Sequence, residues 1–272
     1  KSLNFQFKFF LTFQTMKNYL KFSKGNKKLN KDTLIFDLPA GKTCPGANEC
    51  HSFVTVKDGK RTIKDGANCK FRCYAASQEA LFSAVYEKRK YNLELIQNTL
   101  NSENGFYKTS KFINESLHKS INKNIKKVRI HSSGDFFSGE YLRCWLAVAR
   151  LNPQLKFYCY SKSLNLFGTN VSLPNNFYLT ASVGGKFDYL IYTRNFLKEG
   201  YPQFKRYAIV VNSVIEAETL GLLHRNKPYK IDTDDSSCFK DDAFALLLHG
   251  VQPKGSKASK DLELIKKSKI KK

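Results

Sequence analysis

Short apolar runs bounded by turns alternate with amphipathic stretches over most of this chain of 272 residues. The apolar runs are rich in β-branched and aromatic residues and end at polar or glycine-containing clusters, which is typical of buried strands. We predict strands at residues 33–38, 128–131, 155–161, 177–183, 206–212 and 243–249. Between most of these runs, apolar residues recur at helical spacing. We predict helices at residues 75–100, 110–124, 138–151, 187–197 and 214–222, with Ser138 as the N-cap of the third.

The alternation of strands and helices predicts an α/β fold with a largely parallel sheet. Two architectures fit it: a partial (β/α) barrel, or an open parallel sheet covered by helices. We expect one α/β domain at residues 33–253, with a cysteine-rich loop at 44–73. A hairpin is expected inside that loop at 52–68, where two Asp-Gly pairs mark turns. A basic irregular segment at 1–32 precedes the domain, and a lysine-rich amphipathic tail at 254–272 follows it.

Polar and glycine-rich residues follow directly after the predicted strands. The carboxyl ends of parallel strands meet at one edge of a sheet or barrel, where binding sites form. We therefore expect one shared site at this edge. The contributing segments are His131-Ser132-Ser133-Gly134-Asp135, Ser161-Lys162-Ser163, Ser182-Val183-Gly184-Gly185, Asn212-Ser213 and His249-Gly250.

Several residues at this edge have two interpretations each. His131 and Asp135 suit an acid/base or substrate-anchoring pair, or an N-capping turn in which backbone carbonyls satisfy His131. His249 and Gln252 could enter the site, or could form a turn that ends the strand. Ser182, Gly184 and Gly185 could cradle a phosphate, carboxylate or nucleoside group through backbone amides. The run Asp232-Thr233-Asp234-Asp235 suits a divalent cation or, the preferred interpretation, a solvated acidic loop.

Four of the seven cysteines lie close together in the sequence, at Cys44, Cys50, Cys69 and Cys73. Clustered thiols in a chain that carries no secretory signal indicate metal binding rather than disulfides. Five residues separate the first pair and three the second, which is wide for a zinc knuckle and favours an iron–sulfur cluster. Zinc stays the alternative. The other cysteines, at 144, 159 and 238, are interpreted as ordinary buried thiols.

The chain is strongly basic, with a formal net charge of +23. Many of the lysines lie in the two end segments, so we expect any contact with nucleic acid there. Arginine is scarce beside lysine, which argues against direct base readout. An AT-rich genome would produce the same lysine excess. No apolar run approaches the roughly 18–20 residues that cross a bilayer, and the basic aromatic start lacks a signal-peptide cleavage site. We therefore expect a protein of the cytoplasm or of an organelle interior, translated from before residue 1 or from Met16.

Four segments of the chain carry a resemblance to a known family. They are Thr-Cys-Pro-Gly-Ala at 43–47, Arg-Cys-Tyr-Ala-Ala-Ser-Gln-Glu-Ala at 72–80, Val-Arg-Ile-His-Ser-Ser-Gly-Asp-Phe-Phe at 128–137 and His-Gly-Val-Gln-Pro-Lys-Gly-Ser at 249–256. In this order they resemble the phage gene product 88 family, which occurs in phages, plasmids and related mobile elements. The resemblance covers roughly residues 33–260.

The resemblance implies a protein that looks like a distant relative of radical S-adenosylmethionine enzymes. In those enzymes three cysteines bind a 4Fe–4S cluster and leave one iron open for the amino and carboxylate groups of the cofactor. By this resemblance Cys44, Cys50 and Cys73 are the ligands, and Cys69 is an additional thiol. Their spacing departs from the usual Cys-x-x-x-Cys-x-x-Cys run. If the protein is catalytic, we expect the pocket to combine catalytic residues, His131, Asp135 and His249, with cofactor-binding residues, Ser133, Ser182, Gly184 and Gly185.

Three functional hypotheses follow. The first is an iron–sulfur protein that, if catalytic, cleaves S-adenosylmethionine reductively on an unknown substrate. The second is a non-catalytic, nucleic-acid-associated protein with a structural zinc or iron–sulfur site, acting in phage or plasmid replication or maintenance. The third is a decayed reading frame that still folds. Iron, sulfide and zinc contents distinguish the first from the second.

Overall fold

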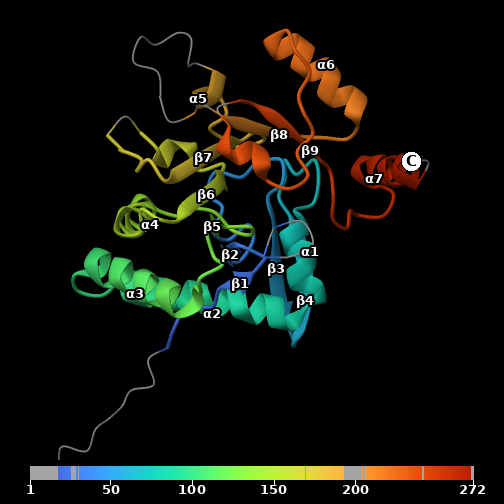
Figure 1. Cartoon of the computed structure of the whole chain (residues 1–272). Helices are drawn as coiled ribbons and strands as arrows, with labels where there is room; N and C mark the ends of the chain where they lie inside the picture. Colours follow the sequence, from blue (N-terminus) through green and yellow to red (C-terminus); the bar gives the residue numbers. More distant parts are fainter. Residues whose placement is uncertain are drawn as a thin grey trace, which may run out of the picture.

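Seven strands of the chain form one sheet (Figure 1) in the order β1-β2-β5-β6-β7-β8-β9. The computed structural model describes residues 18–25, 29, 31–168, 170–192, 204, 206–240 and 242–270, so Met16 and most of the N-terminal segment at 1–32 lie outside the described residues. The strands are β1 (Ser23–Lys24), β2 (Thr33–Phe36), β5 (Lys127–Ile130), β6 (Lys156–Ser161), β7 (Phe177–Ser182), β8 (Tyr207–Val211) and β9 (Phe244–Leu247).

The sheet is mostly parallel, as the sequence predicts. Strand β1 pairs antiparallel with β2, and every later pair in the sheet is parallel. Each parallel strand lies beside the next one in the sequence, which is the order found in (β/α) barrels. Among the described residues β1 and β9 form the two edges, so the sheet stays open rather than closing into a barrel. The α/β fold class is therefore confirmed.

Helices connect the strands and cover the sheet (Figure 1). The long ones are α2 (Ser83–Leu100), α3 (Gly105–Ser120), α4 (Gly139–Leu151) and α6 (Val214–Arg225). Helix α4 begins as predicted, because the Ser138 hydroxyl accepts a hydrogen bond from the Tyr141 backbone amide. Helix α5 (Tyr189–Tyr192) begins inside the helix predicted at 187–197, whose last residues lie outside the described part of the chain.

The prediction of one helix over 75–100 is wrong at Phe82. This residue is extended, with φ −116° and ψ 108°, and it separates α1 (Tyr74–Leu81) from α2. The chain changes direction here because the two helices have different partners. Helix α1 packs on the hairpin of β3 (Ser52–Lys57) and β4 (Lys60–Asp65), whereas α2 packs on α3. The hairpin itself confirms the prediction at 52–68, and its turn residues Asp58 and Gly59 both have positive φ.

The two faces of the parallel sheet have different roles. Side chains at alternate positions point to opposite faces of a strand. One set, which includes Phe36, Val128 and Phe157, packs with Trp145 of α4 in the main hydrophobic core. The other set forms an inner face that is partly polar. Ile35 pairs with Arg129 across β2 and β5, and Tyr160 and Ser182 lie on the same face of β6 and β7.

The remaining cysteines and the C-terminal tail follow the sequence interpretation. Cys144, Cys159 and Cys238 are buried. In the tail predicted at 254–272, helix α7 (Lys257–Ile270) packs Ala258 and Ile265 against Leu248 after β9. None of the helices in the described part of the chain combines the length and apolarity needed to cross a membrane.

Candidate functional site

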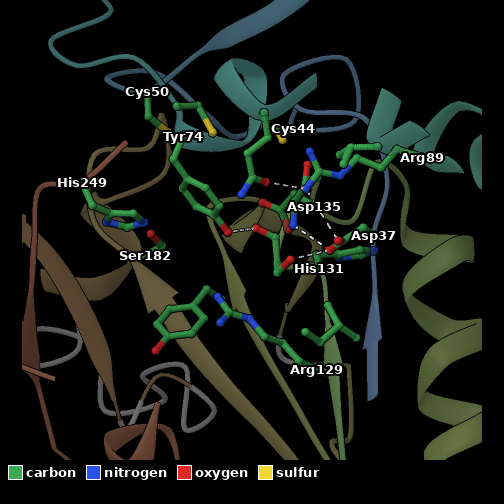
Figure 2. A pocket seen from close by; sticks show the side chains of 18 of the residues that line it. Asp37, Cys44, Cys50, Tyr74, Arg89, Arg129, His131, Asp135, Ser182 and His249 are labelled. Carbon is green, nitrogen blue, oxygen red and sulfur yellow. Dashed lines mark hydrogen bonds and ion pairs between the residues drawn. The ribbon is translucent and has the colours of Figure 1, made fainter. Parts of the chain in front are cut away.

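A cavity of about 810 Å³ opens on the inner face of the sheet, at the carboxyl ends of the strands (Figure 2). Strands β2, β5, β6, β7, β8 and β9 all contribute to its wall, as do the cysteine loop and α1. Four of the five predicted strand-end segments therefore reach one site. Asn212-Ser213 does not line it, because Ser213 caps α6 instead. The lining residues among those predicted are Cys44, Cys50, Cys73, His131, Ser133, Asp135, Ser182 and His249.

Three cysteines from two parts of the loop face this cavity. Cys44 and Cys50 follow β2, and Cys73 lies directly before α1. Burial raises the pKa of each thiol, to about 12 for Cys73, and repulsion among the three adds to the effect on Cys44 and Cys73. Cys69 does not line the cavity. Its sulfur lies 3.5 Å from the Ser52 hydroxyl and 3.1 Å from the Phe71 carbonyl.

The described residues contain no group of three or more His, Cys, Asp or Glu side chains arranged to hold a metal ion. Tetrahedral zinc, with Zn–S bonds near 2.3 Å, requires its sulfurs about 3.8 Å apart. The three thiols therefore share a cavity without forming a closed single-ion site.

The loop that carries Cys44 and Cys50 is fixed on the turns that follow β6 and β7. Lys186 donates its backbone amide to the Gly46 carbonyl at 2.8 Å, and Glu49 donates to the Gly184 carbonyl at 3.0 Å. Ala47 and Gly185 form an isolated antiparallel bridge between these contacts. Gly46 lies so close to the backbone of Lys162 and Ser163 that a Cβ would collide with it. Only glycine fits this position without moving the loop.

Asp135 holds the turn after β5 to the turn after β6. Its carboxylate accepts hydrogen bonds from the backbone amides of Phe136, Lys162 and Ser163 and from the hydroxyls of Ser161 and Ser163, at 2.7 to 3.2 Å. Burial raises the pKa of Asp135, while each of these donors favours the ionised form. All of its contacts are internal, so Asp135 fixes the shape of the site.

His131 lies between the cavity and the aromatic core. Its ring packs edge-on against Phe136, and its Nε2 lies 2.9 Å from the Tyr141 hydroxyl. Its Nδ1 is buried and has no hydrogen-bond partner among the described residues. Burial lowers the pKa of His131 to about 3. The imidazole is therefore neutral at pH 7. The backbone at His131 is left-handed, with φ 66°, which directs the chain into the Ser-Ser-Gly turn.

A buried ionic network lies beside His131 (Figure 2). The Arg89 guanidinium of α2 lies 3.0 Å from the Glu79 carboxylate of α1 and 3.6 Å from the Asp37 carboxylate after β2. Asp37 also accepts from the Ser132 hydroxyl at 2.7 Å and the Ser133 amide at 2.9 Å. The network connects the ends of β2 and β5 to α1 and α2, the two helices that follow the cysteine loop.

Lys162 and Ser182 form the opposite wall. The Lys162 ammonium donates to the Ser182 hydroxyl at 3.0 Å, to the Ser182 carbonyl at 3.3 Å and to the Val183 carbonyl. These acceptors match the three donors of an ammonium group. Lys162 is 9% exposed and contributes positive charge near Cys50. The amides of Gly184 and Gly185, the predicted cradle, donate to the carboxylate of Asp188 at 2.7 and 2.9 Å.

Tyr74 and His249 form a third wall, where the last strand end meets the cysteine loop. Their rings lie 4.7 Å apart between centroids, and the Tyr74 hydroxyl donates to the Ser132 carbonyl. Gly250 has φ +86°, and a Cβ there would lie 2.7 Å from the Tyr74 Cβ. Gln252 bonds to the backbone of Arg72 in both directions, at 2.8 and 3.1 Å.

The four sequence segments named above meet around this cavity, and comparison with known proteins agrees with them. The family model described as Gene product 88 matches residues 20–267. The chain belongs to the gene product 88 family. It is 29% identical over 154 residues to the Gene 88 protein of Mycobacterium phage L5. That alignment spans 53% of this chain and 54% of the phage protein, so the chain covers about half the length of this relative. No solved structure matches the chain.

The acidic run of this gene product 88 protein differs from the sequence interpretation of a solvated loop. Asp235 is 2% exposed and forms an ion pair with Arg129 on the inner face of the sheet. Asp232 is also buried and accepts from the amides of Asp234 and Ser237 at 2.9 and 2.7 Å. Each carboxylate accepts hydrogen bonds from its own donors within the protein, and these offset the repulsion between neighbouring carboxylates.

Sequence reasoning missed several residues that shape the gene product 88 site. They are Asp37, Glu79, Arg89 and Arg129, each of which lies in or beside the cavity wall. Their partners are distant in sequence, so no local spacing indicates them. A signal was available for Asp37, because it is a carboxylate near the end of a predicted apolar strand.

Proposed function

We propose that this gene product 88 protein binds a 4Fe–4S cluster through Cys44, Cys50 and Cys73, at the carboxyl end of the sheet. The observation that carries the proposal is the division among the four clustered cysteines. The three that the family resemblance assigns as ligands line one cavity, and Cys69 lies outside it. A structural zinc site would use all four thiols, and its geometry is absent from the described residues.

Binding a cluster would require the three thiols to ionise. Buried thiols that repel one another are difficult to ionise, as the raised pKa of Cys44 and of Cys73 indicates. Bound iron would reverse this effect, since a metal favours the thiolate form. Cluster ligands grip separate corners of a group larger than one ion, so they need not lie within a single-ion distance of each other.

The proposed activity is that of a radical S-adenosylmethionine-like enzyme with an unknown substrate. A cluster with three protein ligands supplies one-electron transfer and an open iron position for an amino and carboxylate group. The chain's own residues shape and shield that position. Lys162 keeps a positive charge beside Cys50, and the Tyr74–His249 pair forms one wall of the cavity. Because the His131 imidazole is neutral at pH 7, we assign His131 to positioning rather than to proton transfer.

Anaerobic purification followed by iron, sulfide and zinc analysis tests this proposal. We expect about four irons and four sulfides per chain in the wild type. Cys44→Ser, Cys50→Ser and Cys73→Ser should each lose most of the iron. Cys69→Ser is the matched control, because Cys69 belongs to the same loop, and it should retain the iron. One zinc per chain, or equal loss in all four variants, would contradict the cluster.

The cofactor is tested separately on the reconstituted protein. S-Adenosylmethionine should change the paramagnetic spectrum of the reduced cluster, because its amino and carboxylate groups would bind the open iron. An unchanged spectrum in a protein with full iron content would refute the enzymatic part and leave the cluster in place.

Nucleic-acid binding through the lysine-rich ends is a second candidate. Exposed lysines on α7 favour it, since Ala258 and Ile265 bury the other side of that helix. Binding that weakens steeply with added salt would support it.

A further inference from the structure

Three residues on neighbouring strands form a row across the cavity from the cysteines. Ser23 of β1 pairs with Ile35 of β2, which pairs with Arg129 of β5, and all three line the cavity. Figure 2 shows Arg129 at the opposite end of the cavity from Cys44 and Cys50. Lys88 of α2 also lines this end and donates a hydrogen bond to the Ser23 hydroxyl. The two cations therefore lie on either side of Ile35. Lys88 reaches Ser23 of β1 from α2, and Arg129 belongs to β5, two strand positions or roughly 10 Å from β1.

Both cations have hydrogen-bonding capacity that the described residues do not use. Ser23 accepts one of the three donors of the Lys88 ammonium, and its own hydroxyl hydrogen stays available for another acceptor. Arg129 forms its ion pair with Asp235 through Nη1, while its Nε is buried without a partner in the described part of the chain. A buried donor without an acceptor is costly, so such donors usually have one.

The carboxylate that faces this end of the cavity is engaged elsewhere. Asp37 lies near Lys88, but its oxygens accept from Ser132 and Ser133 and lie beside Arg89. The walls between these groups are apolar, with Leu29, Ile35 and Val85. A polar group between charged donors and an apolar surface is a typical arrangement in ligand pockets.

We propose that this end of the cavity is a binding subsite for an anionic oxygen group of the substrate, a phosphate or a carboxylate. The group would lie over Ile35 and accept hydrogen bonds from Lys88, Ser23 and Arg129. The subsite uses none of the cysteines, so it is independent of the proposed cluster. The substrate class is accordingly an anionic molecule whose remaining part extends toward the cysteines.

Chemical footprinting of the full-length chain, purified in air without a cluster, tests the subsite. Lysine acetylation is measured by mass spectrometry with and without pyrophosphate or succinate as the probe. The bound probe should slow acetylation of Lys88 about tenfold at ten times its dissociation constant. Lys90 is the internal control, because it lies on the same helix, is exposed and pairs with Glu94 at 3.6 Å. Its acetylation rate should not change.

Two variants extend the test. The probe should raise the unfolding temperature of the wild type and of Lys90→Met, and this rise should be lost in Lys88→Met. Protection by pyrophosphate alone identifies a phosphoryl group, and protection by succinate alone identifies a carboxylate. The subsite is refuted if neither probe protects Lys88, if Lys88 and Lys90 are slowed equally, or if Lys88→Met keeps the full temperature rise.

Discussion

The contact that holds the cysteine loop against the turn after β6 can be tested by adding one methyl group. In Gly46→Ala the new Cβ would lie 2.7 Å from the Ser163 backbone nitrogen and closer still to the Lys162 carbonyl. The Lys162 carbonyl oxygen would lie 2.1 Å from the new Cβ, whereas ordinary contact begins at 3.4 Å, so the loop or the turn after β6 must move by about 1.3 Å. Both clashing groups are backbone, and no rotamer change relieves them.

The displacement has a calculable cost. Overpacking of this kind costs about 1–3 kcal/mol. Moving the loop also weakens the bond from the Lys186 amide to the Gly46 carbonyl, which spans 2.8 Å, and a hydrogen bond contributes about 1 kcal/mol. We expect a total loss of about 2–4 kcal/mol in the free energy of unfolding.

Urea unfolding followed by circular dichroism measures the loss, and iron analysis reports on the thiols. Gly139→Ala is the matched control, because a Cβ at this first residue of α4 meets nothing within 4 Å. Its stability should stay within about 0.5 kcal/mol of the wild type. If Gly46→Ala were as stable as Gly139→Ala and kept its full iron content, the argument that this contact fixes the loop would be refuted.

Two further predictions concern the buried titratable groups at the strand ends. The pKa of His131 is about 3 in the folded protein against 6.5 in the unfolded chain, so the unfolded state binds this proton first. The free energy of unfolding is therefore unaffected by this histidine above about pH 6.5, and it falls by up to about 5 kcal/mol as the pH is lowered toward 3. In His131→Asn the free energy of unfolding should fall less steeply with decreasing pH, and a slope equal to that of the wild type would contradict the burial of a neutral imidazole. Asp135→Asn should lose about 2–4 kcal/mol, because its amide NH₂ would face backbone donors that the carboxylate now satisfies. Asp32→Asn, which changes a half-buried surface ion pair with Lys127, is its control in the same urea titration and should lose less than about 1 kcal/mol.

The sequence predicts the sheet well because its signals are local. Each parallel strand is a short apolar run, and polar residues at the ends of β2, β5, β6, β7 and β9 enter the cavity. The order of the strands follows from their alternation with helices. The break at Phe82 was not predictable in this way, because the apolar spacing continues through it and the break depends on two different packing partners.

The candidate site, like the fold, was predicted from the sequence only where its signals are local. Cys44, Cys50 and Cys73 are recognisable in the sequence as a cluster of thiols, and they do line one cavity. Its charged walls were not predicted, because they arise from pairs far apart in sequence. Arg129 and Asp235 are 106 residues apart, and Asp37 and Ser133 are 96 apart. Spacing along the chain carries no information on such pairs, whereas the register of the sheet determines them.

The contact between the two ends of the domain has a consequence for biosynthesis. Gln252 bonds to Arg72 across 180 residues, and the Ser77 hydroxyl donates to the Val251 carbonyl across 174. A chain that is still being synthesised can pair each new strand with the one before it, since neighbours in sequence are neighbours in the sheet. The wall formed by Tyr74 and His249, however, cannot exist until residue 252 has left the ribosome. Maturation of the cavity is therefore a late step of folding, and truncation just after β9 would yield a folded sheet with an incomplete site.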